Sequence, residues 1–170
     1  MSNEAAKINK KAMKPLDSAR LAQLLRGQRW GCLGTQRKGK ALVSWVAFTV
    51  EEDFSGLLLH LSRLAQHTRN LETDPEVSLA LSEADDGHAD PQTLARLSLQ
   101  GRVEIIDPQA EDYAAAKARY LAALPEAEML FQFGDFSLFR FVPESARYVD
   151  GFASSHSLTP AQLQGAAQQK

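Results

Sequence analysis

The stretch LLLHLSRLAQHTRNLETDPEVSLAL, residues 57–81, decides the fold of this 170-residue chain. It begins as an apolar strand, becomes polar at Ser62-Arg63, and continues into a short helix from Gln66. Asp74-Pro75 ends that helix because proline cannot continue it, and a second strand starts at Val77. A helix that starts directly after a strand leaves free backbone N–H groups, which can hold an anion such as phosphate.

Side chains near this helix start offer further donors. Ser62 and Thr68 can donate hydrogen bonds, and His67 and Arg69 can add charge. The alternative is an ordinary surface helix with Thr68 as its cap and no ligand. The residues alone leave both interpretations open.

The overall composition excludes several classes of protein. A formal net charge of −2 argues against a dedicated nucleic-acid binder, which normally carries a basic field. Cys32 is the single cysteine, so the chain can form no internal disulfide and suits a reducing cytoplasm. No apolar run approaches the roughly 20 residues of a membrane span, so we expect a cytoplasmic protein that does not enter a membrane.

The remaining elements point to a mainly β (α+β) single domain. Asp17 or Ser18 is expected to cap a helix, and another helix is expected over 109–124. Glycine within a predicted strand, at Gly101, indicates a bulge, and Pro143-Glu144-Ser145 predicts a turn. Further strands are predicted over residues 30–35, 41–50, 93–106, 135–142 and 146–149.

These strands favour a closed barrel. Short hairpins between consecutive strands indicate an antiparallel sheet, and strands that are apolar on both faces favour closure with helices at the ends. In the strand over 41–50 both faces are apolar, so we expect it to be covered on both sides. We expect a disordered arm over 1–14, one domain over 15–158 and a flexible tail over 159–170.

The titratable residues form no recognisable metal or nucleophile motif. The four histidines lack the short spacing of a structural zinc site. His60 and His88 are interpreted as background, and Cys32 as a small core residue in a strand.

Three motifs give the chain a family resemblance. They are L-x-x-L-A-x-H-T-R-N-L with D-P-x-V-S-L (61–71 and 74–79), D-F-x-L-F-R-x-x-P-E-x-A (135–146), and V-x-G-F followed by a histidine (149–156). On these motifs the chain resembles the pyridoxamine 5′-phosphate oxidase-related, FMN-binding split-barrel family. It is most similar to the heme-utilisation (HugZ/HutZ-like) branch.

The resemblance implies a six-stranded antiparallel split β-barrel with flanking helices. It also implies a homodimer with cofactor sites at the subunit interface and a small-molecule substrate. In the flavin-binding members, one strand lies along the flavin ring and the segment after another holds the phosphate. The matching cofactor-binding residues are Ser44, Val46, Ala47, Phe48, Leu61, Ser62, Gln66, His67, Thr68 and Arg69.

The chain departs from the oxidase itself at several positions. The oxidase carries an Arg-Lys pair where this chain has His67-Thr68, and its substrate-binding arginine has no counterpart in the tail ASSHSL. Pyridoxamine phosphate oxidation is therefore not assigned, and no catalytic residue is identified. Arg96 falls near a glutamine that contacts the cofactor in the oxidase and is a further candidate.

The heme-utilisation branch implies a different cofactor. There a C-terminal histidine ligates the heme iron and an aspartate supports it, and His156 and Asp135 match these positions. His67 then lies near heme rather than phosphate. The first hypothesis is an FMN-dependent oxidoreductase of unknown substrate. The alternative is a heme-binding or heme-degrading protein with His156 as axial ligand, and the third is a flavin or heme carrier without turnover.

Overall fold

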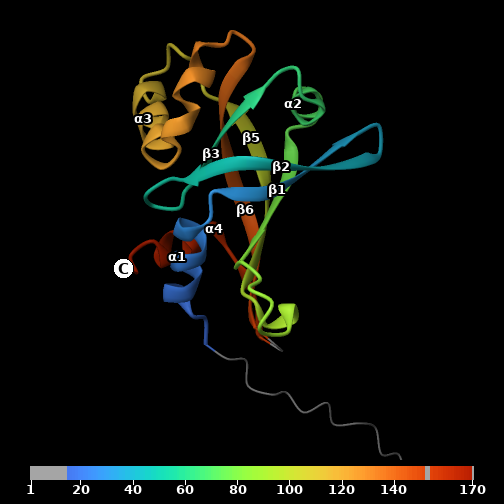
Figure 1. The fold of residues 1–170 in the computed structure, drawn as a ribbon, viewed down its shortest axis with the longest axis vertical. Helices are drawn as coiled ribbons and strands as arrows, with labels where there is room; N and C mark the ends of the chain where they lie inside the picture. The colour runs from blue at the N-terminus through green and yellow to red at the C-terminus, as the bar shows by residue number, and fades with distance from the viewer. Residues whose placement is uncertain (1–14, 152–153, 170) are drawn as a thin grey trace, which may run out of the picture.

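Seven antiparallel strands form one curved sheet in the computed structural model, which describes residues 15–151 and 154–169 (Figure 1). The predicted arm over 1–14 and Phe152 of the glycine–phenylalanine motif lie outside the described residues. The strands are β1 (Trp30–Arg37), β2 (Lys40–Val50), β3 (Leu57–Ser62), β4 (Glu76–Ser82), β5 (Arg96–Ile105), β6 (Phe136–Gly151) and β7 (Ser154–Leu158).

Six of these strands close into a barrel. The sheet order is β3-β2-β1-β4-β5-β6-β7, and an additional pairing of β3 with β6 joins the two ends of the first six strands. In that pairing Leu57 lies opposite Phe141 and Ser62 lies opposite Phe136. The six-stranded antiparallel barrel is therefore confirmed, with β7 added along the free length of β6.

The strand β6 corrects one prediction. Pro143-Glu144-Ser145 does not turn the chain, because β6 continues from Phe136 to Gly151. Gly101 pairs with Pro143 and Gln100 with Ser145, so Glu144 is the extra residue of a bulge. A bulge accommodates proline within a strand, and it bends β6 without ending it. The bulge that Gly101 predicted is confirmed.

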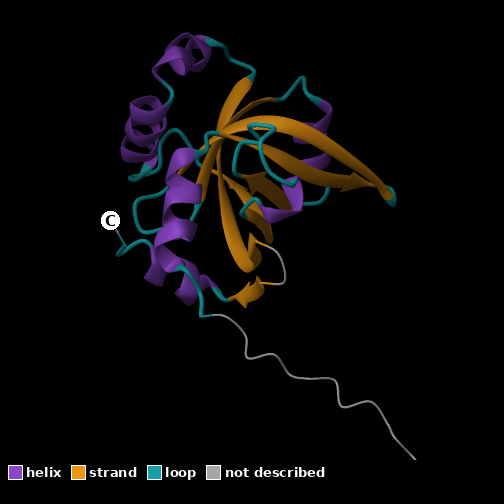
Figure 2. Cartoon of the chain, turned by 60° about the horizontal axis from the view of Figure 1, so that its bottom comes forward, coloured by secondary structure: helices purple, strands orange, loops and turns teal. Residues whose placement is uncertain are grey.

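Short helices pack around the barrel (Figures 1 and 2). Asp17 caps α1 by accepting a hydrogen bond from the backbone N–H of Arg20. The helix predicted over 109–124 is shorter and is followed by a 3₁₀ helix. The helical segments are α1 (Ser18–Gly27), α2 (Gln66–Leu71), η1 (Pro91–Thr93), α3 (Tyr113–Ala123), η2 (Pro125–Gln132) and α4 (Pro160–Ala166).

The C-terminal segment is a helix rather than the flexible tail that its Gln/Ala-rich composition suggested. Thr159 and Gln162 form a capping box at the start of α4, and Leu163 and Ala166 are buried. Arg26 of α1 donates hydrogen bonds to the carbonyl oxygen atoms of Ala167 and Gln169. Capping and burial therefore override the weak composition signal, and α4 packs beside α1.

Two hydrophobic clusters stabilise the fold. The larger fills the barrel and includes the apolar faces of α1 and α4. The smaller lies between β3, β6, α3 and η2, around Leu58, Tyr120 and Leu138. No helix in the described ranges is long and apolar enough to cross a membrane.

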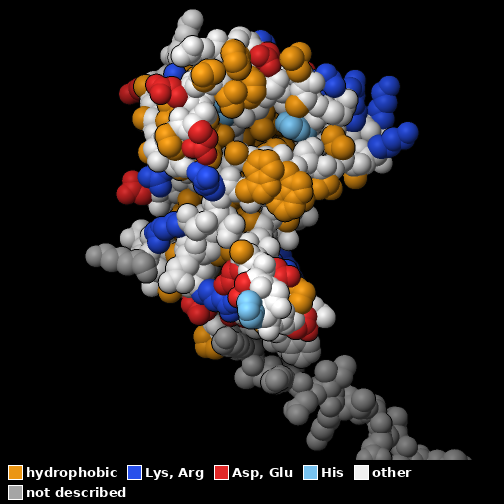
Figure 3. All heavy atoms as spheres, viewed as in Figure 1, with side chains coloured by type: hydrophobic (Ala, Val, Ile, Leu, Met, Phe, Trp, Pro, Cys, Tyr) orange, Lys and Arg blue, Asp and Glu red, His pale blue; other side chains and the backbone are white. Residues whose placement is uncertain are grey.

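The β1–β2 hairpin projects from the barrel, and its turn residues Lys38 and Gly39 have φ angles of 50° and 73°. Cationic side chains gather at its tip, and exposed apolar side chains lie nearer the barrel (Figure 3). On β2, Val43 and Trp45 are 65% and 60% exposed. The described residues of the single chain therefore do not provide the expected cover on that side of the strand.

Candidate functional site

The predicted phosphate segment folds as expected, but its side chains are largely engaged within the chain. α2 has only six residues, and its first-turn residue Thr68 is fully buried. The Thr68 hydroxyl has no hydrogen-bond partner among the described residues and does not cap the helix. Gln66 and Arg69 are exposed, with Arg69 donating to the carbonyl oxygen of Leu64 at 2.8 Å.

A carboxylate occupies the polar end of β3. The Ser62 hydroxyl donates to Asp135 Oδ2 at 2.5 Å and accepts from the backbone N–H of Leu64 at 3.1 Å. The backbone N–H of Arg63 donates to the Asp135 carbonyl oxygen at 2.7 Å. The Ser62 hydroxyl, which was expected to hold phosphate, is thus bound to a carboxylate, and this carboxylate opposes the binding of a second anion there.

The strand expected to lie along a flavin ring presents little side-chain surface. Val46 and Phe48 are buried in the main core, as is Leu61 of β3. Ser44 is half-buried on the same side as Val46, whereas Ala47 points to the opposite side. The predicted cofactor residues therefore do not converge on one open site in the single chain.

The side of the sheet that faces away from the core, which we call the outer face, carries a different set of residues. Cross-strand partners share a face of the sheet, so the pairings define a row across β2, β1, β4, β5, β6 and β7. An aromatic side chain stands near one end of this row, an arginine near the other, and small side chains form most of the floor between them. The row consists of Trp45, Cys32, Ala80, Ser98, Arg147 and Ser157.

A cavity of about 460 Å³ opens on the outer face. Trp30 and Trp45 line it with rings stacked at 6.0 Å and an angle of 5° between their planes. Arg96 lines both this cavity and a neighbouring one of about 470 Å³, which Arg147 shares. Each volume lies within the range of about 300–1,000 Å³ typical of small-molecule sites.

The two arginines of the outer face are available for an anion. Arg96 donates only to the backbone carbonyl oxygen atoms of Gln92 and Leu94, and Arg147 donates to the Ser157 hydroxyl. Neither guanidinium has a carboxylate partner among the described residues, so both can pair with the carboxylates of a ligand.

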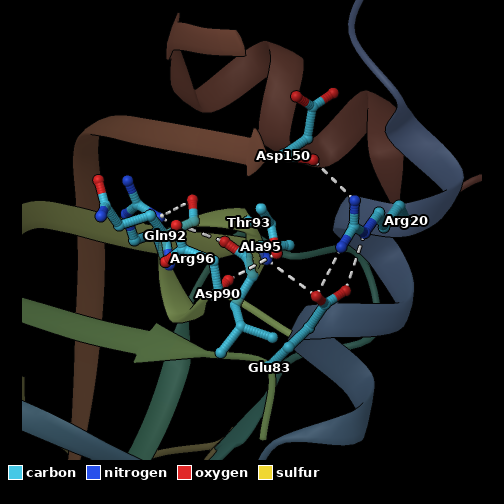
Figure 4. Close-up of polar contacts among 9 residues, drawn as sticks. Arg20, Glu83, Asp90, Gln92, Thr93, Ala95, Arg96 and Asp150 are labelled. Atoms are coloured by element: carbon cyan, nitrogen blue, oxygen red, sulfur yellow. Dashed lines mark hydrogen bonds and ion pairs between the residues drawn. The ribbon is translucent and has the colours of Figure 1, made fainter. Parts of the chain in front are cut away.

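Beside this region, α1 is fastened to the end of the sheet (Figure 4). Arg20 donates to both carboxylate oxygen atoms of Glu83, at 2.8 and 2.6 Å, and to the Asp150 carbonyl oxygen at 2.7 Å. The hydrogen bond from Arg20 lowers the pKa of Glu83. The Glu83 carboxylate also accepts from the backbone N–H of Ala95. The Arg20–Glu83 pair therefore holds together α1, the connection between β4 and β5, and the end of β6.

His156 lies in β7, which pairs with the C-terminal part of β6. It is 6% exposed in β7, opposite Tyr148 of β6, and its Nε2 atom is 3.3 Å from the Ser154 hydroxyl oxygen. Burial raises the pKa of Tyr148 to about 12. Asp135 lies just before the other end of β6, so one chain does not bring Asp135 to His156.

Two other histidines are kept neutral by their surroundings. His60 stacks on Phe131 with ring centroids 3.7 Å apart, and burial lowers its pKa to about 4. Burial also lowers the pKa of His67 on α2. His60 is thus a core residue, as its background interpretation implies, whereas His67 remains half-buried at the predicted segment.

Most residues of the outer face are not predicted by the sequence. Arg96 is a predicted candidate, but Trp30, Trp45 and Arg147 are not. Cys32, interpreted as a core residue, is partly exposed and lines the cavity. The available signal was the alternation of small outward residues along β4 and β5. These residues are Ser78, Ala80 and Ser82, with Ser98 on the next strand.

Comparison with known proteins gives several matches of similar fold. The heme oxygenase HOZ of the Arabidopsis thaliana chloroplast is 33% identical over 148 residues, covering 84% of this chain and 42% of HOZ. The heme oxygenase HutZ of Vibrio cholerae is 27% identical over 123 residues, covering 72% of this chain and 69% of HutZ. A heme-binding protein from Mycobacterium smegmatis superposes with a TM-score of 0.78 at 27% identity, covering 90% of this chain and 62% of that protein.

These relatives favour the heme alternative over the FMN-dependent oxidoreductase that was the first hypothesis. The chain spans less than half of HOZ and less than two thirds of the mycobacterial protein. The family described as CREG, beta-barrel, matches residues 13–163, which include the whole barrel and the first half of α4. Since that match and the six-stranded split barrel agree, the chain belongs to the CREG β-barrel family.

Proposed function

We propose that this chain binds heme on its outer face and takes part in heme degradation. The observation that carries the proposal is the row from Trp45 to Arg147, with small residues between an aromatic and a cationic end. Four strand spacings of about 4.8 Å separate the two ends, roughly 19 Å along the curved sheet. A flat ring with carboxylate side chains matches this donor set, and relatives named heme oxygenases support the choice.

The residues of the chain bind and shield the ring. Trp30 and Trp45 offer aromatic surface for stacking, and Arg96 and Arg147 offer guanidinium groups for the carboxylates. Heme supplies the iron at which dioxygen reacts when the ring is degraded. The small floor residues allow the ring to approach the sheet, which excludes water from one of its sides.

The proposed site is completed by a second copy of the chain. Trp30, Val43 and Trp45 are exposed next to the cavity, and β2 is apolar on a side that no described residue covers. Exposed apolar surface of this kind, next to a hollow, is typical of an interface. A homodimer with two sites between the subunits would cover this surface and close the cavity over the ring.

Titration with hemin tests the binding proposal. The purified chain should develop a Soret band that saturates near one hemin per chain, and it should not retain FMN. Trp45→Ala should weaken hemin binding by about 10- to 100-fold because stacking surface is lost. Leu64→Ala, which truncates an exposed residue elsewhere, is the control and should leave binding unchanged.

Turnover is tested separately on the loaded protein. With a reductant in air, the Soret band should decay and a linear tetrapyrrole should appear, whereas hemin with the reductant alone should give a different product mixture. A chain that binds FMN but not hemin would contradict the proposal. A chain that binds hemin without degrading it would restrict the function to carriage.

A further inference from the structure

His156, the histidine that the family resemblance assigns to the heme iron, faces the core side of β7. Side chains alternate along a strand, and Ser154, His156 and Leu158 are buried while Ser157 is exposed. Ser157 belongs to the outer-face row, and Ser154 and Ser155 line the cavity shared with Arg96 and Arg147. The His156 side chain itself lines neither of the two outer-face cavities.

Contacts on the core side hold the imidazole in place. Its ring lies 6.4 Å from the ring of Tyr148, with 28° between their planes, and Ser154 is within hydrogen-bond distance of Nε2. Tyr148 is itself completely buried. Turning His156 to the outer face would require β7 to slip by one residue, which would expose the buried Leu158 and break the present pairing with β6.

No histidine lines the outer-face cavities in the part of the chain that the structure describes. Their walls present aromatic, small and cationic side chains, chiefly those of Trp30, Trp45, Arg96 and Arg147. Two carboxylates also line the cavity beside the tryptophans, that of Asp85 and that of Glu83, which is paired with Arg20. The aromatic and cationic groups recognise the plane of a ring and its carboxylates, and none of them requires a metal.

We infer that the outer face recognises a planar tetrapyrrole by stacking and carboxylate pairing, without a bond between His156 and iron, so that it also binds the iron-free porphyrin. The inference rests on the proposed function, because it takes the outer face as the tetrapyrrole site. His156 is then a core residue that stabilises the β6–β7 edge. Its contribution is to folding rather than to ligand affinity.

The direct test compares hemin with iron-free protoporphyrin IX on the unmodified chain. Quenching of tryptophan fluorescence gives both dissociation constants, which should agree within about threefold. Porphyrin binding weaker by about tenfold or more, equivalent to about 1.4 kcal/mol, would show that the iron is bound by the protein and would overturn the inference. Binding of neither ligand would instead overturn the proposed function.

Variants distinguish ligand binding by the two arginines from the structural role of His156. The double substitution Arg96→Gln and Arg147→Gln should weaken hemin and porphyrin by the same factor, about tenfold or more, because both carry the same carboxylates. Arg37→Gln, which removes one positive charge at the hairpin tip, should affect neither. His156→Gln should lower the midpoint of thermal unfolding while the Soret maximum and hemin affinity of the folded protein stay unchanged. Loss of the Soret band in a folded His156→Gln variant would contradict the inference.

Discussion

At the scale of single residues, His60 shows how burial alone sets the behaviour of a titratable group. The imidazole is 8% exposed and lies among the rings of Tyr120, Phe131 and Phe136. Burial is the main cause that lowers its pKa from 6.5 to about 4, and nearby Lys117 adds to the effect. Its Nδ1 atom has no partner among the described residues, so protonation would place an uncompensated charge in an aromatic cluster.

This pKa predicts a loss of stability in mild acid. The unfolded chain takes up a proton near pH 6.5 and the folded chain only near pH 4, so stability is complete above pH 6.5 and falls as pH decreases towards 4. At pH 5 the loss from His60 is about 2 kcal/mol. Urea unfolding at pH 7.5 and 5.0 measures it.

Two variants test whether His60 causes the loss of stability in mild acid. His60→Phe keeps the stacking but cannot be protonated, so its unfolding free energy should fall by about 2 kcal/mol less than that of the parent chain between these pH values. His88→Gln changes an exposed histidine and should keep the parental pH dependence. If the unfolding free energies of the parent and of His60→Phe fell equally between pH 7.5 and 5.0, groups other than His60 would cause the loss of stability.

At the scale of elements, alternation of apolar residues predicted most strands, and residues 57–81 predicted the β3–α2–β4 unit. Composition alone could not distinguish a bulge from a turn at Glu144, because both use proline and short polar residues. The helix α4 was missed since its stability comes from the capping box and from packing on α1. Arg96 and Ala47, which lie on the outer face, were named from the sequence as cofactor candidates. The two tryptophans were not, because their position side by side depends on the pairing register of β1 and β2.

The bulge at Gly101 is expected to tolerate no side chain at this position. A Cβ atom at Gly101 would overlap the Val142 carbonyl oxygen and lie 2.9 Å from Pro143 Cα, both of which are backbone atoms that cannot rotate away. Gly101→Ala should therefore destabilise the chain by about 2–3 kcal/mol, measured by urea unfolding. Gly165→Ala in α4 meets no atom within 4 Å and should be neutral or stabilising by up to about 1 kcal/mol. Similar unfolding free energies for both variants would mean that the backbone of the bulge shifts to make room for the added Cβ atom.

At the scale of the whole molecule, the uncovered side of the β1–β2 hairpin predicts self-association. Trp45→Glu introduces a charge into the proposed interface and should weaken the homodimer by about 100-fold or more, because buried tryptophans dominate such interfaces. Light scattering coupled to gel filtration across a dilution series measures the change. Met129→Glu, on the equally exposed apolar surface of η2, is the control. A parent chain that is monomeric at all concentrations would remove the basis for an interfacial site.

The barrel is closed by the pairing of β3 with β6, and β6 also pairs with β5 and β7. The chain is synthesised from its N-terminal end. The edges of β3 and β5 that pair with β6 therefore have no hydrogen-bond partners until residues 136–151 have been made. Bringing β3 and β6 together also closes a long loop, which slows folding. The nascent chain therefore passes through a stage with two unprotected strand edges, and a chain that ends before β6 is expected to aggregate rather than fold.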